Sequence, residues 1–159
     1  MRNVAGAVSI VTASVDGRCA GLTATSLTAL SADPPTIIVC VNRAASAWPT
    51  IQRAGRFAIN VLAARHQSIA DRFAGRGGHK GEERFAEGDW TTLITGAPIL
   101  QGTLATLDCE IEEAIDRHSH TILIGRVKAI QASQEEGALL YWRGLYGTFD
   151  DDFQNGAGI

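Results

Sequence analysis

Four short stretches contain residue types that could bind a small ligand. The first, residues 21–26 with the sequence GLTATS, places Thr23, Thr25 and Ser26 behind Gly21. Hydroxyl and backbone N–H donors gathered at the end of a strand suit the edge of a polar ring or a phosphate. Thr and Ser are also ordinary strand and turn residues, so this stretch needs support from others.

The second stretch, residues 40–48 with the sequence CVNRAASAW, leads from a strand end through a loop into a predicted helix. Ser46 is the expected N-cap, and Arg43 precedes it in the loop. Amides at a helix start together with a guanidinium form an anion site, whose apolar side Trp48 would cover. An ordinary N-cap beside a solvated arginine has the same residues.

A third stretch, residues 116–121 with the sequence DRHSHT, is predicted to be a turn that enters a strand. His118 and His120 are two positions apart, which places them on the same face of extended backbone. A metal would need His66 or His79 as a third ligand, and no carboxylate or cysteine stands at a supporting spacing, so no metal is expected. His120 would instead donate to a phosphate or amide of a ligand, or lie in solvent.

A fourth stretch, residues 141–146 with the sequence YWRGLY, surrounds an arginine and a glycine with aromatic residues. Aromatic rings can stack on a planar ligand while the arginine holds a negative group. An ordinary strand that contributes aromatic residues to a core has the same composition.

Short β-branched runs separated by turn residues must position these stretches. The expected strands are residues 7–12, 19–25, 36–41, 57–62, 104–114, 120–133 and 139–141. Asp16-Gly17 predicts a hairpin between the first two strands. The run 36–41 is apolar almost throughout, so we expect both of its faces to be covered.

Two short helices are predicted at residues 47–54 and 67–73. Pro49 would lie in the first turn of the first helix, which Gly55 would end. Residues 74–89 are glycine-rich and charged, so they are expected to form a surface loop or lid. Many short strands with two small helices favour a closed antiparallel barrel over a parallel sheet.

Composition excludes several classes of protein. The chain has 159 residues, the size of one domain, and a net charge of −3 that gives no reason to expect nucleic acid or an anionic membrane as a partner. Its three cysteines lack metal or redox spacing, and no apolar run approaches the ~20 residues of a membrane span, so we expect a cytoplasmic protein without a signal peptide. The glycine run 75–81 follows no strand and lacks the GxGxxG pattern, which excludes a Rossmann nucleotide site.

Taken together and in this order, the motifs resemble the short-chain flavin reductase family, the reductase components of two-component flavin-dependent monooxygenases. The similarity covers nearly the whole chain, and its main blocks are AVSIVTAS, GLTATSLTALSADPPTIIVCVNRAASAWPTI, GRFAINVLAARHQSIADRFAG, GAPILQGTLATLDC, HTILIGRV and LLYWRGLY. The resemblance implies a mainly β, antiparallel FMN-binding split β-barrel of Greek-key type over residues 1–150, followed by a tail at 151–159. It also implies a homodimer with flavin near the subunit interface.

The resemblance further implies individual roles. The residues that would bind flavin are Gly21, Leu22, Thr23, Thr25, Ser26, Cys40, Val41, Asn42, Ser46, Ala47, Arg72 and Phe73. The residues that would bind the nicotinamide nucleotide are His120, Tyr141, Trp142, Arg143 and Gly144. His118-Ser119 stand where the family has Gly-Asp before the histidine.

The activity implied by the resemblance is the reduction of FMN or FAD by NADH or NADPH. Hydride would pass directly between the stacked rings, without a catalytic acid, a covalent nucleophile or a metal. The electrons would serve a separate oxygenase. Two alternatives stay open: a flavin-dependent reductase of a corrinoid, cob(II)yrinic acid a,c-diamide, and a non-enzymatic flavin- or haem-binding module. His120 and the stretch 141–146 favour an enzyme over a binding module.

Overall fold

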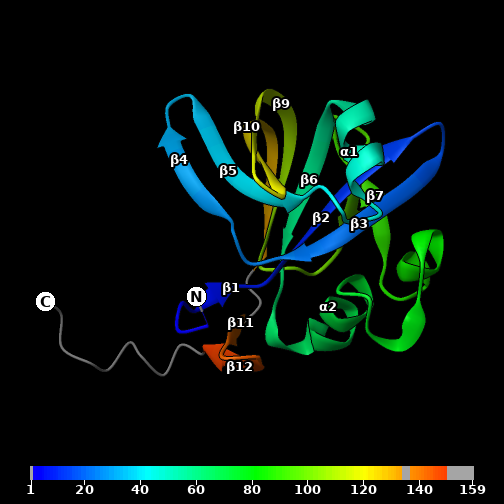
Figure 1. The fold of residues 1–159 in the computed structure, drawn as a ribbon, viewed down its shortest axis with the longest axis vertical. Coiled ribbons are helices and arrows are strands. Elements are labelled where there is room, and N and C mark those ends of the chain that lie inside the picture. Colours follow the sequence, from blue (N-terminus) through cyan, green and yellow to red (C-terminus); the bar gives the residue numbers. More distant parts are fainter. Residues whose placement is uncertain (1, 134–136, 150–159) are drawn as a thin grey trace, which may run out of the picture.

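The centre of the molecule is a curled seven-stranded antiparallel sheet (Figure 1), seen in a computed structural model that describes residues 2–133 and 137–149. The strand order is β3-β2-β6-β9-β10-β5-β4. The bounds are Ser9–Val15 (β2), Arg18–Ala24 (β3), Thr28–Ala32 (β4), Pro35–Asn42 (β5), Arg56–Val61 (β6), Ala105–Arg117 (β9) and His120–Ala132 (β10). Leu22 of β3 and Val39 of β5 belong to one buried cluster, although their strands lie near opposite ends of the sheet. The sheet therefore curls around a single core, and the predicted antiparallel split barrel is confirmed.

Two smaller sheets lie beside the barrel. The first has the order β1-β11-β12, formed by Gly6–Ala7, Ala138–Trp142 and Leu145–Phe149. The second is the hairpin of β7 (Trp90–Thr92) and β8 (Pro98–Leu100). Figure 1 shows β11 and β12 below the barrel, next to α2 (Gln67–Phe73).

The two predicted helices are present. Helix α1 (Trp48–Ala54) carries Pro49 in its first turn, buries Trp48 and Ile51, and ends at Gly55, whose φ of 64° favours a glycine. Helix α2 matches its prediction residue for residue, with Ile69, Ala70 and Phe73 buried on one face. The predicted cap is wrong, because Ala47 occupies the N-cap of α1 and Ser46 lies one residue before it.

Several other expectations need correction. Ile38 and Cys40 of β5 are partly exposed, so only one face of this strand is fully covered. Strands β4, β7, β8 and β12 were not expected, and residues 74–89 contain the 3-10 helices η2 (Arg76–Gly78) and η3 (Gly81–Ala86). The tail predicted at 151–159 lies outside the described residues. No helix in the described part of the chain has the length and apolarity needed to cross a membrane.

Candidate active site

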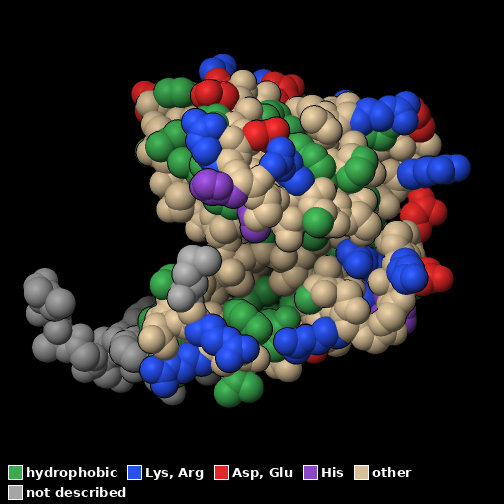
Figure 2. Space-filling view, in the orientation of Figure 1, with side chains coloured by type: hydrophobic (Ala, Val, Ile, Leu, Met, Phe, Trp, Pro, Cys, Tyr) green, Lys and Arg blue, Asp and Glu red, His purple; other side chains and the backbone are tan. Residues whose placement is uncertain are grey.

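Three neighbouring cavities share Thr23 as a wall. The tyrosine cavity, of about 200 Å³, is lined by Val8, Thr23, Thr25, Ala74, Arg76, Tyr141 and Tyr146. The loop cavity, of about 370 Å³, is lined by Leu22, Thr23, Asn42, Ala44, Ala45, Ser46, Phe73, Ala74 and Arg84. The histidine cavity, of about 250 Å³, is lined by Leu22, Thr23, Ala24, Thr25, Ser26, Cys40, Asn42 and His120. Figure 2 shows a hollow between the barrel above and the smaller lower part, with Lys and Arg side chains along its lower rim.

The end of β3 and helix α2 form the common wall of these cavities. Thr23 Oγ1 donates to the carbonyl of Ala70 at 2.7 Å, which ties the strand to the helix. A Cβ at Gly21 would lie 2.7 Å from the ring of Phe73, so the helix can approach the strand this closely only at a glycine. The predicted flavin residues at 21–26 and Phe73 are therefore brought together.

A second tie joins the ends of β3 and β5. Ser26 Oγ donates to the carbonyl of Cys40 at 3.0 Å and accepts from the Cys40 N–H at 3.1 Å. The hydroxyls of Thr23 and Ser26 are thus engaged with the backbone. Thr25 lies between them in sequence and lines both the tyrosine and the histidine cavity. The Thr23 and Ser26 hydroxyls therefore mainly fix the positions of the strand ends that form the site.

The loop between β5 and α1 is held in two directions. Asn42 Oδ1 accepts a hydrogen bond from the Ala44 N–H at 2.9 Å. Arg43 pairs with Asp116 at 3.1 Å and donates to the carbonyl of His118, so its guanidinium points toward the tip of the β9–β10 hairpin. The expectation that Arg43 supplies the cation of this loop is therefore wrong.

Arg84, from η3, supplies the guanidinium of the loop cavity. It donates to the carbonyls of Gly21 at 3.0 Å, Phe73 at 3.4 Å and His79 at 3.2 Å. Sequence reasoning missed this residue, because it lies in a charged loop without periodicity and reaches the site only through tertiary contacts. Its one signal is the charge density of the loop.

Arg72 performs a different task from Arg84. Its side chain points to the loop, where it pairs with Glu87 at 3.4 Å and donates to the carbonyl of Glu83 at 3.2 Å. Ser68 donates to the other oxygen of the same Glu87 carboxylate. Arg72 therefore fastens the loop 74–89 to α2.

The two histidines of the third stretch do not share a face. His118 has a φ of 51° and forms a two-residue turn with Ser119, and Arg117 pairs with His120 across it. His120 begins β10 and lines the histidine cavity, where its Nδ1 lies 2.9 Å from Ser119 Oγ. The expected alternation fails because a turn separates the two residues. Among the described residues, no group of three His, Cys, Asp or Glu side chains could hold a metal.

The fourth stretch is divided in the same way by a turn. Tyr141 of β11 and Tyr146 of β12 line the tyrosine cavity and pack edge to face, with ring centroids 5.3 Å apart. Arg143 and Gly144 form the turn between them, with φ values of 53° and 93°. Trp142 Nε1 donates to the carbonyl of Asn3 at 3.2 Å, and Arg143 Nε donates to Oδ1 of the same residue at 2.9 Å. Tyr141 therefore faces the cavity, while Trp142 and Arg143 contact the N-terminal segment.

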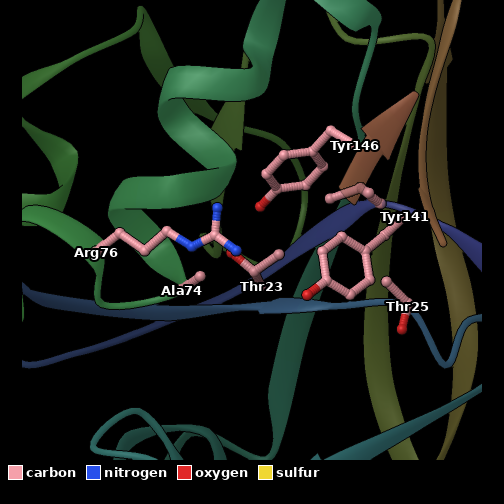
Figure 3. A pocket seen from close by; sticks show the side chains of 7 residues that line it. Thr23, Thr25, Ala74, Arg76, Tyr141 and Tyr146 are labelled. Carbon is pink, nitrogen blue, oxygen red and sulfur yellow. The ribbon is translucent and has the colours of Figure 1, made fainter. Parts of the chain in front are cut away.

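Arg76 and Tyr146 line one side of the tyrosine cavity (Figure 3), and Asp71 completes a cluster with them. Arg76 pairs with Asp71 at 2.8 Å, and its guanidinium lies 5.4 Å from the centroid of the Tyr146 ring. The Tyr146 hydroxyl donates to Asp71. Burial, and next the negative charge of Asp71, raise the pKa of Tyr146 to about 12. Tyr146 belongs to the fourth stretch of aromatic residues, whereas Arg76 was not among the residues expected to bind a ligand.

The chain was compared with known proteins. The family model described as flavin reductase like domain matches residues 1–150. FMN reductase (NADH) RutF 2 of Methylorubrum extorquens (strain PA1) is 45% identical over 144 residues, covering 89% of this chain and 81% of the relative. The flavin-dependent monooxygenase reductase subunit HsaB of Rhodococcus jostii (strain RHA1) is 38% identical over 145 residues, covering 91% of this chain and 72% of the relative. The crystal structure of BorF, the flavin reductase component of a bacterial two-component tryptophan halogenase, superposes with a TM-score of 0.86 at 32% identity, covering 94% of each chain.

Proposed function

The chain belongs to the family of flavin reductase-like domains, and on that premise we propose that it reduces FMN or FAD with NADH or NADPH and supplies a separate oxygenase. The observation that carries this proposal is the meeting of three cavities at Thr23. Together they offer backbone and hydroxyl donors, a guanidinium and an aromatic wall along one hollow. These are the groups that a ligand with a planar ring and a phosphate requires.

The residues present fit a flavin. The histidine cavity, with Thr25, Cys40 and His120, suits the polar edge of a ring, and the loop cavity offers Arg84 and Ser46 to a phosphate. Of the remaining flavin residues of our prediction, Leu22 and Phe73 line the loop cavity. The others stay predictions: Gly21, Val41, Ala47 and Arg72. When bound, flavin supplies a ring that accepts two electrons as hydride.

The protein's own task is positioning. Thr23 and Ser26 fix the ends of β3 and β5, so the walls that would orient the two rings are rigid. Arg84 holds the loop 74–89 against β3 and α2, which limits the access of water. His120 and Tyr141 would contact the nicotinamide nucleotide from two sides of Thr25. Trp142, Arg143 and Gly144 stay predicted nucleotide residues at the turn beside that wall.

We further infer a cytoplasmic homodimer. Large apolar side chains remain exposed in the single chain, among them Val4 at 76%, Leu145 at 73% and Ile130 at 60%. A second copy that covers such side chains would remove them from water. Light scattering is expected to give about twice the chain mass of 16.9 kDa, and the mass of a single chain would contradict the dimer.

Titration of the purified protein with FMN, followed by flavin fluorescence, tests the central proposal. We expect saturable binding, and NADH consumption that depends on added flavin. Folded protein that neither binds FMN nor FAD nor oxidises NADH in their presence would overturn the assignment. Binding without oxidation would leave a flavin-binding module.

A further inference from the structure

The tyrosine cavity contains a second guanidinium that the flavin site does not need. We infer that Arg76 binds the pyrophosphate of a dinucleotide in this cavity, with Tyr146 and Asp71 as its positioning residues. The inference rests on the proposed function, because it assigns the phosphate contact of a nucleotide that this function requires. Nicotinamide dinucleotides and FAD share the chemistry, and FMN does not.

Arg76 is held in place on two sides. Asp71 accepts a hydrogen bond from one terminal nitrogen at 2.8 Å, and the ring of Tyr146 lies under the guanidinium at 5.4 Å from its centroid. Figure 3 shows the nitrogens directed from the side of Ala74 toward Thr23 and the two tyrosines. The side chain is half-exposed, so a ligand in the cavity can reach it. Its orientation is therefore set before a ligand arrives.

The hydrogen-bonding capacity of Arg76 exceeds what Asp71 uses. A guanidinium carries five N–H donors in a planar fork, and one of them is given to the Asp71 carboxylate. That carboxylate also accepts from the Tyr146 hydroxyl, so its own charge is shared between two donors. Donors on the cavity side of Arg76 can bind a phosphate in the bidentate geometry that arginine favours.

The position of the cavity indicates which phosphate it would bind. The loop cavity has a cation of its own, Arg84, beside Ser46 and Asn42. If the flavin phosphate binds in the loop cavity, Arg76 on the other side of Thr23 can bind a different phosphorylated group. Tyr141 and Tyr146 give the same cavity an aromatic wall, as a second nucleotide would need.

Arg76→Gln and Arg76→Lys test the assignment, with Arg53→Gln as the matched control. Arg53 pairs with Asp16 at 2.6 Å on an exposed surface, so its loss removes one arginine and one ion pair away from the cavities. Dissociation constants are measured for FMN, FAD and ADP-ribose, a probe that carries the pyrophosphate without nicotinamide. ADP-ribose binding is measured without flavin, so it does not depend on reductase activity.

We expect Arg76→Gln to raise the dissociation constant of a pyrophosphate ligand about tenfold or more and to change that of FMN by less than about twofold. Arg53→Gln should change neither dissociation constant. Weaker ADP-ribose binding with a raised Michaelis constant for NADH identifies the hydride donor as the ligand. Weaker FAD binding with ADP-ribose unchanged identifies the flavin dinucleotide. Arg76→Lys keeps the charge and should recover part of the affinity, and it decides the question if the Gln variant fails to fold.

Unchanged affinity for both FAD and ADP-ribose in a folded variant would overturn the inference. An equal loss of FMN affinity would also overturn it, because Arg76 would then bind the phosphate of the mononucleotide. Wild-type protein that binds neither FMN nor FAD would contradict the proposed function instead, and the ADP-ribose titration would still report on Arg76.

Discussion

His120 and His118 are two residues apart in sequence, but only His120 lines a cavity. Substitutions at the two positions therefore form a matched pair. His120 lines the histidine cavity, whereas His118 lies in the turn before it. We expect His120→Ala to raise the Michaelis constant for NADH by roughly ten- to 150-fold, the value of one hydrogen bond to a charged group, and to leave FMN affinity unchanged. His118→Ala should change neither. Steady-state kinetics and flavin titration check both, and an equal loss of flavin affinity in His120→Ala would place the histidine on the flavin.

The three cysteines report on different parts of the molecule. Cys40 lines the histidine cavity, while Cys19 lines a separate cavity with Phe85 and Trp90. Cys109 is fully buried, and burial, and next the charge of Asp108, raise the pKa of its thiol to about 12. We expect a maleimide to label Cys19 and Cys40 but not Cys109 in the native protein, because the thiolate is the reactive form.

Bound FMN should then protect Cys40 and leave Cys19 reactive. Mass spectrometry of labelled peptides measures the labelling rates of Cys19 and Cys40. The variants Cys40→Ser and Cys19→Ser, which each leave one of these two thiols, are the controls. Equal protection of the two thiols would show that flavin acts on the whole fold instead of the histidine cavity.

Ser9 and Thr12 are buried polar residues of β2 that differ in hydrogen bonding. The Ser9 hydroxyl has no hydrogen-bond partner within the described residues, whereas Thr12 Oγ1 donates to the carbonyl of Pro98 at 2.5 Å. Ser9→Ala should leave the free energy of unfolding unchanged or raise it by up to about 1 kcal/mol. Thr12→Val should lower it by about 1–3 kcal/mol, since a buried carbonyl loses its donor. Urea unfolding compares the two, and a marked loss in Ser9→Ala would reveal a partner for its hydroxyl.

At the scale of elements, the loop 74–89 depends on a few charged contacts. Arg84 donates to three backbone carbonyls, two of which belong to β3 and α2. Arg84→Gln should make amide hydrogen exchange in this loop roughly tenfold faster or more and should speed FMN dissociation. Arg126→Gln is the control, because Arg126 pairs with Glu112 on the barrel surface. Unchanged exchange in the loop would mean that the Phe73–Phe85–Trp90 ring cluster holds it without Arg84.

Elements with strong local patterns could be predicted from the sequence. The 3.6-residue apolar period of α2 and the β-branched run of β5 were both sufficient. β4 was missed because four of its five residues are exposed and no alternation marks them. A turn was expected within residues 116–121, but its position between His118 and His120 was not, because His118 adopts a positive φ without a glycine or asparagine to signal it. The turn at 143–144 was not expected, although Gly144 lies in it.

The candidate site was predictable at the strand ends, in the loop before α1 and at the end of α2, where Ser46 and Phe73 line the loop cavity. Residues 21–26 and Cys40 are neighbours because the β3 and β5 ends converge, as their sequence motifs indicated. Arg76 and Arg84 reach the site from the loop 74–89, so their roles depend on packing over long sequence separations. Patterns along the chain contain no information on such contacts.

At the scale of the whole molecule, Tyr146 connects the C-terminal hairpin to α2 through Asp71. Its pKa of about 12 in the folded chain exceeds the value near 10 of an unfolded tyrosine. Burial first, and next the charge of Asp71, favour the neutral form of Tyr146 in the folded chain, so its contribution to stability is fully present below about pH 10 and is lost as the pH rises toward 12. Tyr146→Phe should be less stable than the wild type at neutral pH, and the difference should shrink above pH 10. Thermal unfolding at several pH values measures it, and a constant difference would contradict this role.

Thr23 forms part of all three cavity walls, and its hydroxyl is anchored to the Ala70 carbonyl. If a ligand bound against this shared wall changes the affinity for a second ligand, thermodynamic linkage requires the factor to be the same in both directions. A nicotinamide nucleotide that raises the affinity for oxidised flavin would itself bind with higher affinity once flavin is present. Because Thr23 lines all three cavities, a flavin and a nucleotide bound side by side would both contact it, and each would form part of the other's binding surface.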